Sequence, residues 1–253
     1  MSTSQDDILA RELAYHENLY SGFAQSHFAR PAVRALRSNM VQRILHLTGA
    51  NSTSRVLSIG CGIGDTELLL APHVRELTGV DLSPAGIRQA NADAQQLGIH
   101  NARFIEGTAD VAQGPFDVVI AIFLLHHLSD ADLIEFAAHM ARILTPGGVF
   151  YSLDPSRHRA SGAVGRLLIP SLMKKYQTDD ERELDPEETR RLFGREWKSV
   201  RTDTYDFGSS PMAGLFPGSS AAYNLSRGID DLLLRLPFFR QYGSNFEIIA
   251  TRS

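Results

Sequence analysis

Three alternating glycines follow a short apolar run and form a pattern with clear chemical meaning. The run is Val56–Ile59, and Gly60, Gly62 and Gly64 come directly after it. Glycines at such a turn let backbone N–H groups approach a ligand without a Cβ in the way. Asp81 ends the next apolar run, where a carboxylate can accept hydrogen bonds from both hydroxyls of a ribose. The combination predicts a site for a nucleoside-bearing ligand. The alternative is a tight strand–helix turn beside a solvated aspartate.

The spacing of the glycines also bears on which nucleoside would bind. A dinucleotide fingerprint has the spacing Gly-x-Gly-x-x-Gly, whereas residues 60–64 of this chain read Gly-x-Gly-x-Gly. The later position holds Asp65, an acid at the expected helix start, where a pyrophosphate would otherwise lie. Because a carboxylate there repels an anionic cofactor, the pattern favours a ligand that carries a sulfonium and an amine over NAD or FAD.

Short apolar runs alternate with amphipathic stretches from residue 55 onward, and these elements must position the site. Strands separated by helical patterns indicate right-handed βαβ units and a parallel sheet covered on both faces. The expected strands span 55–59, 76–80, 102–105, 116–122, 149–153, 197–207 and 245–252. The expected helices span 7–20, 31–49, 65–72, 84–97, 130–143, 186–194 and 225–236.

The composition excludes several classes of protein. The chain has 253 residues, a net charge of −4 and no run of Lys or Arg, which argues against an extended nucleic-acid footprint. The single cysteine, Cys61, excludes a disulfide framework and a cysteine-built zinc site, and no paired base would make it a nucleophile. Met1–Asp7 is unlike a signal peptide, and no apolar run reaches the roughly 18 residues of a membrane span. These features predict a cytoplasmic globular protein without a metal site and without a nucleic-acid or membrane partner.

Six segments together resemble a known family, the class I S-adenosylmethionine-dependent methyltransferases of the UbiE-like, small-molecule kind. The resemblance extends over roughly residues 33–154 and is specific as a set. The segments are Val56–Gly64, Gly79–Ser83, Phe104–Asp110, Phe116–Val119, Leu125–Leu128 and Leu144–Phe150. The resemblance implies an α/β fold, a Rossmann-like three-layer sandwich with a mixed seven-stranded sheet that ends in an antiparallel hairpin. The expected strands at 197–207 and 245–252 fit that hairpin.

The same resemblance implies which residues bind S-adenosylmethionine. The implied cofactor-binding residues are Ser58, Gly60, Cys61, Gly62, Gly64, Asp81, Leu82, Thr108, Ala109 and Asp110. The glycine loop would lie against the methionine and ribose part, Asp81 would hold the ribose hydroxyls, and residues 108–110 would meet the adenine. Two positions depart from the family. Ser58 stands where the family usually has an acid that helps fix the cofactor's amino group, and Thr108 stands where many members have Asp. Both departures are compatible with cofactor binding, because backbone contacts dominate it.

The candidate catalytic residues are two adjacent histidines, His126 and His127, which follow the fourth expected strand. Methyl transfer from a sulfonium is an in-line displacement, in which the protein mainly aligns the nucleophile and excludes water. A hydroxyl acceptor must also lose a proton, and open α/β sheets bind ligands beyond the carboxyl ends of their strands, so this pair is the expected general base. The alternative is that one histidine packs against the loop and the other is solvated. Asp154 and His158 are expected on the same rim, past the end of the fifth strand.

Three regions are expected along the chain. Residues 1–50 would form N-terminal helices that cover the cofactor site, 51–154 the cofactor-binding core, and 155–253 cap insertions and C-terminal strands that form the acceptor pocket. A mostly apolar lining suits a hydrophobic or aromatic acceptor. The expected lining residues are Leu167, Leu168, Ile169, Leu172, Met173, Met212, Leu215, Phe216, Tyr223, Leu232, Leu233 and Phe238.

The sequence therefore predicts a methyltransferase that acts on a small organic acceptor. The histidine pair favours O-methylation, and N- and C-methylation stay open. A NAD-dependent oxidoreductase is one alternative, which the glycine spacing disfavours. A non-catalytic domain that binds the cofactor as a sensor or partner subunit is another, to which Ser58 gives slight support. The sequence leaves the acceptor and the oligomeric state open.

Overall fold

A computed structural model describes residues 29–159 and 182–253, and within them seven strands form one mixed sheet. The strand order is β3-β2-β1-β4-β5-β7-β6. The strands are β1 (Arg55–Ile59), β2 (Glu76–Asp81), β3 (Ala102–Glu106), β4 (Phe116–Ile122), β5 (Leu144–Pro155), β6 (Trp197–Asp206) and β7 (Asn245–Arg252). β7 pairs antiparallel with β5 and β6, and the other neighbours are parallel. The expected Rossmann-like sandwich with an antiparallel C-terminal hairpin is confirmed.

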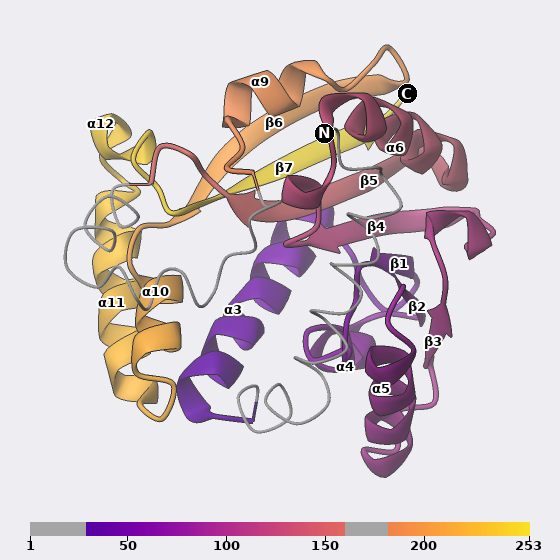
Figure 1. Cartoon of the computed structure of the whole chain (residues 1–253), viewed down its shortest axis with the longest axis horizontal. Coiled ribbons are helices and arrows are strands. Elements are labelled where there is room, and N and C mark those ends of the chain that lie inside the picture. The colour runs from indigo at the N-terminus through magenta and orange to yellow at the C-terminus, as the bar shows by residue number, and fades with distance from the viewer. Residues whose placement is uncertain (1–28, 160–181) are drawn as a thin grey trace, which may run out of the picture.

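Helices cover both faces of this sheet (Figure 1). They are α3 (Pro31–Thr48), α4 (Glu67–Leu70), α5 (Pro84–Gln96), α6 (Asp130–Ile143), α9 (Pro186–Arg191), α10 (Ser209–Leu215), α11 (Ser220–Leu233) and α12 (Pro237–Arg240). Within the described ranges, three short 3₁₀ helices connect elements: η2 (Ala71–His73), η3 (Ala109–Val111) and η4 (Leu125–His127). Helices α3, α4 and α5 contribute buried side chains to one face, and α6 to the other. Helices α10 and α11 pack on α3.

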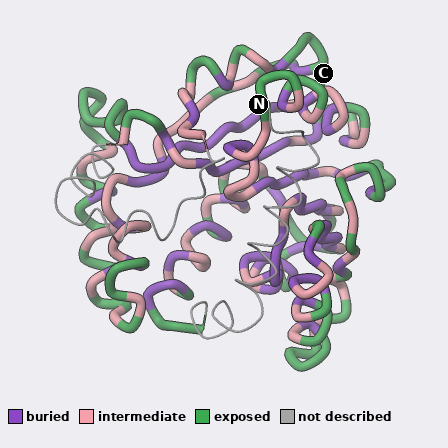
Figure 2. Tube along the Cα trace, viewed as in Figure 1, coloured by how far each residue is buried: buried purple, intermediate pink, exposed green. Residues whose placement is uncertain are grey.

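The core follows from the alternation of side chains along the strands. Val118 and Ile120 of β4 belong to the apolar cluster under α3, while Val119 and Ala121 belong to the cluster under α6. Figure 2 shows that the buried stretches run along the central strands. A sheet buried on both faces is held rigidly, so the loops at its carboxyl edge have a fixed frame.

Several element boundaries differ from the sequence-based prediction. The helix expected at 65–72 is the single turn α4 followed by η2, and β5 begins at Leu144 instead of residue 149. Helix α11 begins five residues earlier than expected. Helix α10 lies in a Gly/Ser/Pro-rich stretch, and its first amides are satisfied by carboxylates from other segments: Ser210 N donates to Asp206 at 2.7 Å and Ser209 N to Asp230 at 2.9 Å.

Some expectations lie outside the described residues, namely the helix at 7–20 and the lining residues between 167 and 173. In the parts of the chain that the structure describes, no helix combines the length and apolarity that a membrane crossing requires.

Candidate functional site

The glycine loop lies where the strand order of the sheet reverses. β1 has β2 on one side and β4 on the other, and open α/β sheets bind ligands in the crevice at such a switch point. Gly60, Gly62 and Gly64 all have left-handed backbones, with φ of 71°, 53° and 73°. A Cβ added to Gly60 would lie 3.1 Å from the side chain of Leu124, in the loop that follows β4. The loops after β1 and β4 therefore meet at this crevice.

Asp81 ends β2 with its carboxylate directed at the glycine loop. Its Oδ2 accepts a hydrogen bond from Gly62 N at 2.7 Å, and its Oδ1 accepts one from Ser83 N at 2.8 Å. Each carboxylate oxygen can accept a second hydrogen bond. Asp81 therefore shapes the loop and still has acceptor capacity for two ligand hydroxyls. Leu82, next in the chain, is 38% exposed at the same edge.

The turn after β3 lies beside Asp81. Gly107 N donates to the Asp81 carbonyl at 2.9 Å, which holds the turn against the end of β2. Thr108 and Asp110 are exposed, and the Thr108 hydroxyl donates to Asp110 Oδ2 at 3.3 Å. Ala109 is partly buried. The structure thus brings the sequence-predicted residues of the glycine loop, β2 and the 108–110 turn to one edge of the sheet.

A buried carboxylate that sequence reasoning missed, Glu67, packs behind the glycine loop. Its side chain belongs to α4, the residue is 3% exposed, and Oε1 accepts a hydrogen bond from the Ser58 hydroxyl at 2.6 Å. Burial, and then the charge of Asp65, raise the pKa of Glu67 to about 7, against the opposing effects of Ser58 and Arg37. A lone acid beside three leucines, at 67–70, was the available sequence signal.

Asp65 forms an ion pair, which corrects the expectation that its negative charge repels an anionic cofactor. Its Oδ2 lies 2.7 Å from Arg37 Nε of α3, and both side chains are mostly buried. The guanidinium offsets the carboxylate, so a repulsive Asp65 does not by itself disfavour an anionic cofactor. Arg37 also lies over the ring of Phe123, 5.9 Å from its centroid. No local pattern predicted Arg37, because it reaches the loop from a helix that precedes β1.

Cys61 is buried in the glycine loop. Burial, followed by the charges of Glu67 and Asp81, raises the pKa of its thiol well above the ordinary value. A thiol with a raised pKa stays protonated and is a poor nucleophile. Cys61 is therefore a small packing residue of the loop, as the sequence indicated.

The two histidines have different environments. His126 is buried in η4, and its Nδ1 lies 3.0 Å from Asp154 Oδ1 at the end of β5. His127 is partly buried, and its ring centroid lies 4.1 Å from that of His126. Because a carboxylate only accepts hydrogen bonds, the contact assigns the proton to Nδ1 and leaves Nε2 of His126 as the basic nitrogen. Asp154 is fully buried, and its Oδ2 has no hydrogen-bond partner among the described residues.

Phe123, at the end of β4, adopts a left-handed backbone with φ of 55°. A bulky residue in that region is a conformational outlier of the kind that gathers at functional sites. Its N–H donates to the Leu153 carbonyl at 2.7 Å, which fixes the turn between the switch point and His126. Nothing in the sequence signalled this conformation.

His158 pairs with a different carboxylate from the one that His126 contacts. Its Nε2 is 2.7 Å from Asp185 Oδ2, and Asp185 is the N-cap of α9. Burial acts to raise the pKa of Asp185, but the Glu188 amide, His158 and Arg157 outweigh it, and the pKa is lowered. A cavity of about 360 Å³ lies beside this pair; its polar lining includes Ser156, Asp185, Thr202, Thr204, Arg240 and Asn245.

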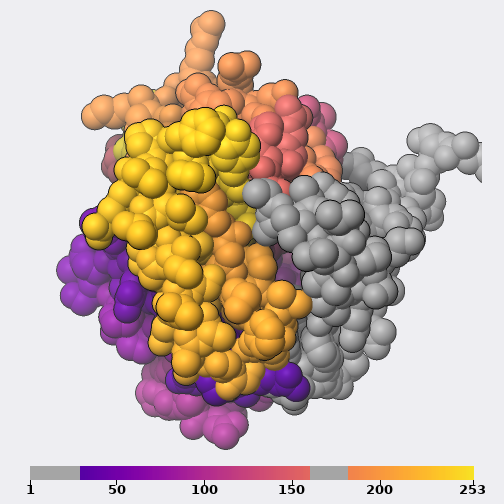
Figure 3. Space-filling model, turned by 90° about the vertical axis from the view of Figure 1, so that its left-hand side faces the viewer, coloured from indigo at the N-terminus to yellow at the C-terminus, as the bar shows by residue number. Residues whose placement is uncertain are grey.

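Four of the apolar residues expected to line an acceptor pocket are exposed. They belong to α10–α12 and the turn between α10 and α11, the orange and yellow surface of Figure 3, and are Leu215, Phe216, Leu232 and Phe238. Tyr223 is buried. None of the twelve expected residues is among the described residues that line the cavity beside His158, so the expected apolar acceptor pocket stays a prediction.

Comparisons with known proteins bear on this site. Residues 56–148 match the sequence profile of a methyltransferase domain. The chain is 37% identical over 103 residues to the uncharacterized methyltransferase YcgJ of Bacillus subtilis, with 40% of each protein covered. It is 30% identical over 174 residues to a ubiquinone biosynthesis O-methyltransferase of Xylella fastidiosa, covering 65% of this chain and 68% of that protein. The fold is similar to that of a DhpI–SAH complex, with a TM-score of 0.61, 16% identity and 99% of both chains covered.

The extent of these matches differs among relatives. The chain spans about half the length of several curated relatives that it matches, between 40% and 56% of YcgJ, a Synechocystis methyltransferase and a Methylobacterium O-methyltransferase. It spans more than two thirds of the Xylella protein. The matched profile contains the glycine loop, Asp81 and both histidines. The chain thus belongs to the class I S-adenosylmethionine-dependent methyltransferases, whose cofactor is S-adenosylmethionine.

Proposed function

We propose that this protein transfers the methyl group of S-adenosylmethionine to a small organic acceptor at the carboxyl edge of β1, β4 and β5. The observation that carries the proposal is Asp81, whose two oxygens accept Gly62 N and Ser83 N beside the left-handed glycine loop. The named activity of the Xylella relative, a ubiquinone biosynthesis O-methyltransferase, supports an oxygen acceptor.

The residues at this edge fit the cofactor. Asp81 would hold the ribose hydroxyls, Gly60 and Gly62 would lie against the methionine and ribose part, and the exposed Thr108 and Asp110 would border the adenine. The bound cofactor supplies a methyl group already activated on a sulfonium. The remaining tasks of the chain are to align the acceptor, to exclude water and, for a hydroxyl acceptor, to remove a proton.

His126 is the proposed general base, and Asp154 is its positioning residue. Asp154 accepts from Nδ1 of His126 at 3.0 Å and also from its backbone N–H at 3.3 Å. The backbone contact fixes the loop and the ring contact fixes the tautomer, so Nε2 is the nitrogen that takes the proton. This assignment favours O-methylation, and an amine or an activated carbon stays the alternative acceptor.

Asp154→Asn tests this assignment. The amide keeps the size of the side chain but can donate to Nδ1, which favours the wrong tautomer, so turnover of an acceptor from a panel of phenols, quinols and amines should fall about 100-fold or more. The affinity for S-adenosylhomocysteine should change less than threefold. His127→Gln is the matched control, and we expect a smaller loss from it. Equal turnover by Asp154→Asn and wild type would refute the role of the pair.

Calorimetric titration with S-adenosylmethionine, S-adenosylhomocysteine and NADH tests the cofactor assignment. We expect micromolar binding of the two sulfur ligands, lost by about 100-fold in Asp81→Ala, because two charge-assisted hydrogen bonds disappear. Asp93→Ala removes a carboxylate of α5 that pairs with Gln89 and should bind like wild type. Binding of NADH alone, or of none of the three ligands, contradicts the proposal.

A non-catalytic protein that only binds the cofactor is the second candidate. It predicts the same titration with no turnover of any acceptor in the panel. We also propose a small-molecule acceptor in place of a nucleic acid, since the net charge is −4, and a cytoplasmic location.

A further inference from the structure

The charges around the glycine loop do not balance. Glu67 and Asp65 contribute two carboxylates behind the loop, and Asp81 contributes a third from β2. Arg37 from α3 supplies a guanidinium, and it pairs with Asp65 at 2.7 Å. Within the part of the chain that the structure describes, neither Glu67 nor Asp81 forms an ion pair with an arginine or a lysine. A nucleoside that also carries a positive charge fits this surplus.

The two anionic side chains have different positions. Asp81 hydrogen-bonds to loop amides at the end of β2, which suits it to the ribose. Glu67 reaches from α4 to the carboxyl end of β1, where the Ser58 hydroxyl donates to its Oε1 at 2.6 Å. Its charge also contributes to the raised pKa of the Cys61 thiol, so the carboxylate is close enough to act on the loop that would hold the methionine part.

We propose that Glu67, held by Ser58, binds the α-amino group of the cofactor and is the specificity residue for that end of the ligand. The inference rests on the proposed function, because it needs S-adenosylmethionine in the glycine loop. Ser58 stands where the resemblance implies an acid on β1, and the hydrogen-bonded carboxylate of Glu67 supplies that acid from the neighbouring helix. An ammonium–carboxylate contact is a charge-assisted hydrogen bond, about twice as strong as a neutral one.

This arrangement makes binding depend on pH. The groups that act on Glu67 are Asp65 of the loop, Ser58 of β1 and Arg37 of α3, and burial with Asp65 raises its pKa to about 7. An ammonium binds the ionised carboxylate, so affinity for a ligand with the amino group should rise as Glu67 loses its proton. With a pKa of about 7, the ionised fraction rises roughly eightfold between pH 6 and pH 7.5.

Two ligands separate the amino acid end, which carries the amino group, from the rest of the cofactor. S-adenosylhomocysteine carries the amino acid end, and 5′-methylthioadenosine has the same adenosine thioether without it. We expect the affinity of wild type for S-adenosylhomocysteine to rise roughly eightfold from pH 6 to pH 7.5, while that for methylthioadenosine changes less than twofold. This comparison measures binding alone and needs no variant.

Glu67→Gln keeps an acceptor for Ser58 and removes the charge. It should lower the affinity for S-adenosylhomocysteine at pH 7.5 by ten- to 100-fold, abolish its pH dependence and leave methylthioadenosine within threefold. Glu76→Gln is the control, because Glu76 begins β2 at the opposite end of the strand and pairs with Arg55. Equal pH profiles of the two ligands, or an unchanged ratio of affinities in Glu67→Gln, overturn this inference and leave the cofactor assignment standing. If wild type binds neither ligand, the proposed function fails as well.

Discussion

A buried carboxylate costs free energy when it ionises, and Glu67 is such a group behind the glycine loop. Ser58 and Arg37 recover part of that cost, while Asp65 adds to it. A core position that ionises near neutral pH is unfavourable for stability alone. Ionisation near neutral pH is useful where a cationic ligand must be recognised. Folding stability and ligand binding are therefore linked through the ionisation of Glu67.

The pH dependence of unfolding should report on Glu67. Its pKa is about 7 in the folded protein, against an ordinary value of 4.5, so the folded state holds a proton that the unfolded chain releases between these values. The stability this gives is fully present below pH 4.5 and is lost as pH rises through 7. Relative to wild type, Glu67→Gln should therefore gain about 2–3 kcal/mol of unfolding free energy between pH 5 and pH 8. Urea unfolding at each pH measures the difference.

The partly exposed Glu76 provides the control for that experiment, because its partner Arg55 is also partly solvent-accessible. Glu76→Gln should change the unfolding free energy by less than about 1 kcal/mol, with little dependence on pH. If Glu67→Gln and wild type lose stability in parallel as pH rises, Glu67 is not the group that titrates near neutrality.

Single residues of the site were predictable to different degrees. Asp81 and His126 stand in local patterns at strand ends, and the structure places both at the carboxyl edge of the sheet. The contact of His126 with Asp154 follows from β4 and β5 being neighbours, which the order of the strands implies. Glu67 was missed because its meaning depends on Ser58, a contact that the packing of α4 on β1 creates.

Among the helices and strands, the alternation of short apolar runs with amphipathic stretches predicted the strands well and the C-terminal helices poorly. Strands β1, β4 and β7 have the expected limits, since each is bounded by turn residues and buried on a regular pattern. Helix α10 is short, and its first amides are capped by Asp206 and Asp230. Asp230 caps the helix from 21 residues further along the chain and leaves no local signal, so a stretch rich in Gly, Ser and Pro resembled a loop.

The glycine loop needs a glycine at position 64 for two reasons, the left-handed backbone and the lack of space for a Cβ. Gly64 has φ of 73°, and an added Cβ would lie 2.8 Å from the ring of Phe104. Gly98, after α5, has φ of 66° with nothing within 4 Å of an added Cβ. Gly98→Ala should therefore cost about 1 kcal/mol, for the conformation, and Gly64→Ala about 3 kcal/mol, for the conformation and the displaced ring. Urea unfolding of both variants compares the cost of the backbone conformation with the added cost of displacing the ring. Equal decreases in unfolding free energy would show that the Phe104 ring moves aside without a free-energy cost.

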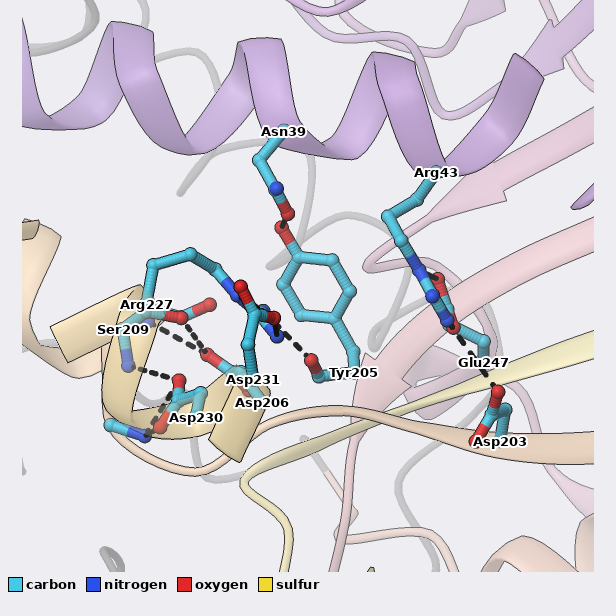
Figure 4. A network of polar contacts seen from close by, with 12 residues as sticks. Asn39, Arg43, Asp203, Tyr205, Asp206, Ser209, Arg227, Asp230, Asp231 and Glu247 are labelled. Carbon is cyan, nitrogen blue, oxygen red and sulfur yellow. Dashed lines mark hydrogen bonds and ion pairs between the residues drawn. The ribbon is translucent and has the colours of Figure 1, made fainter. Parts of the chain in front are cut away.

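At the scale of the whole molecule, polar contacts join α3 to the C-terminal strands and helices (Figure 4). The Tyr205 hydroxyl of β6 donates to Asn39 of α3 at 2.8 Å, and Arg227 of α11 donates to the Tyr205 carbonyl at 2.8 Å. Arg43 of α3 donates to Glu247 of β7, with Nε 3.1 Å from Oε1. Because α3 also carries Arg37, which contacts the glycine loop, one helix connects the cofactor edge to the C-terminal half of the sheet.

The ion pair between Arg43 and Glu247 should be the strongest of these links. Glu247 is fully buried in the sheet, and the Tyr151 hydroxyl donates to its Oε1 at 2.8 Å. Arg43→Leu leaves this carboxylate without its counter-charge and should lower the unfolding free energy by about 3–5 kcal/mol. Adding Glu247→Gln removes the charge and keeps an acceptor for Tyr151, so the double variant should recover about 2 kcal/mol or more of that loss.

Urea unfolding of the two single variants and the double variant closes this cycle. A buried ion pair contributes little stability compared with neutral groups of the same shape, whereas removing one partner leaves the other charge buried at its full free-energy cost. Arg55→Leu is the matched control, because its partner Glu76 is partly exposed and the pair should contribute less than about 1 kcal/mol. A double variant as unstable as Arg43→Leu would contradict the prediction, since it would assign the loss to the packing of the arginine stem on the sheet instead of to the charge of Glu247.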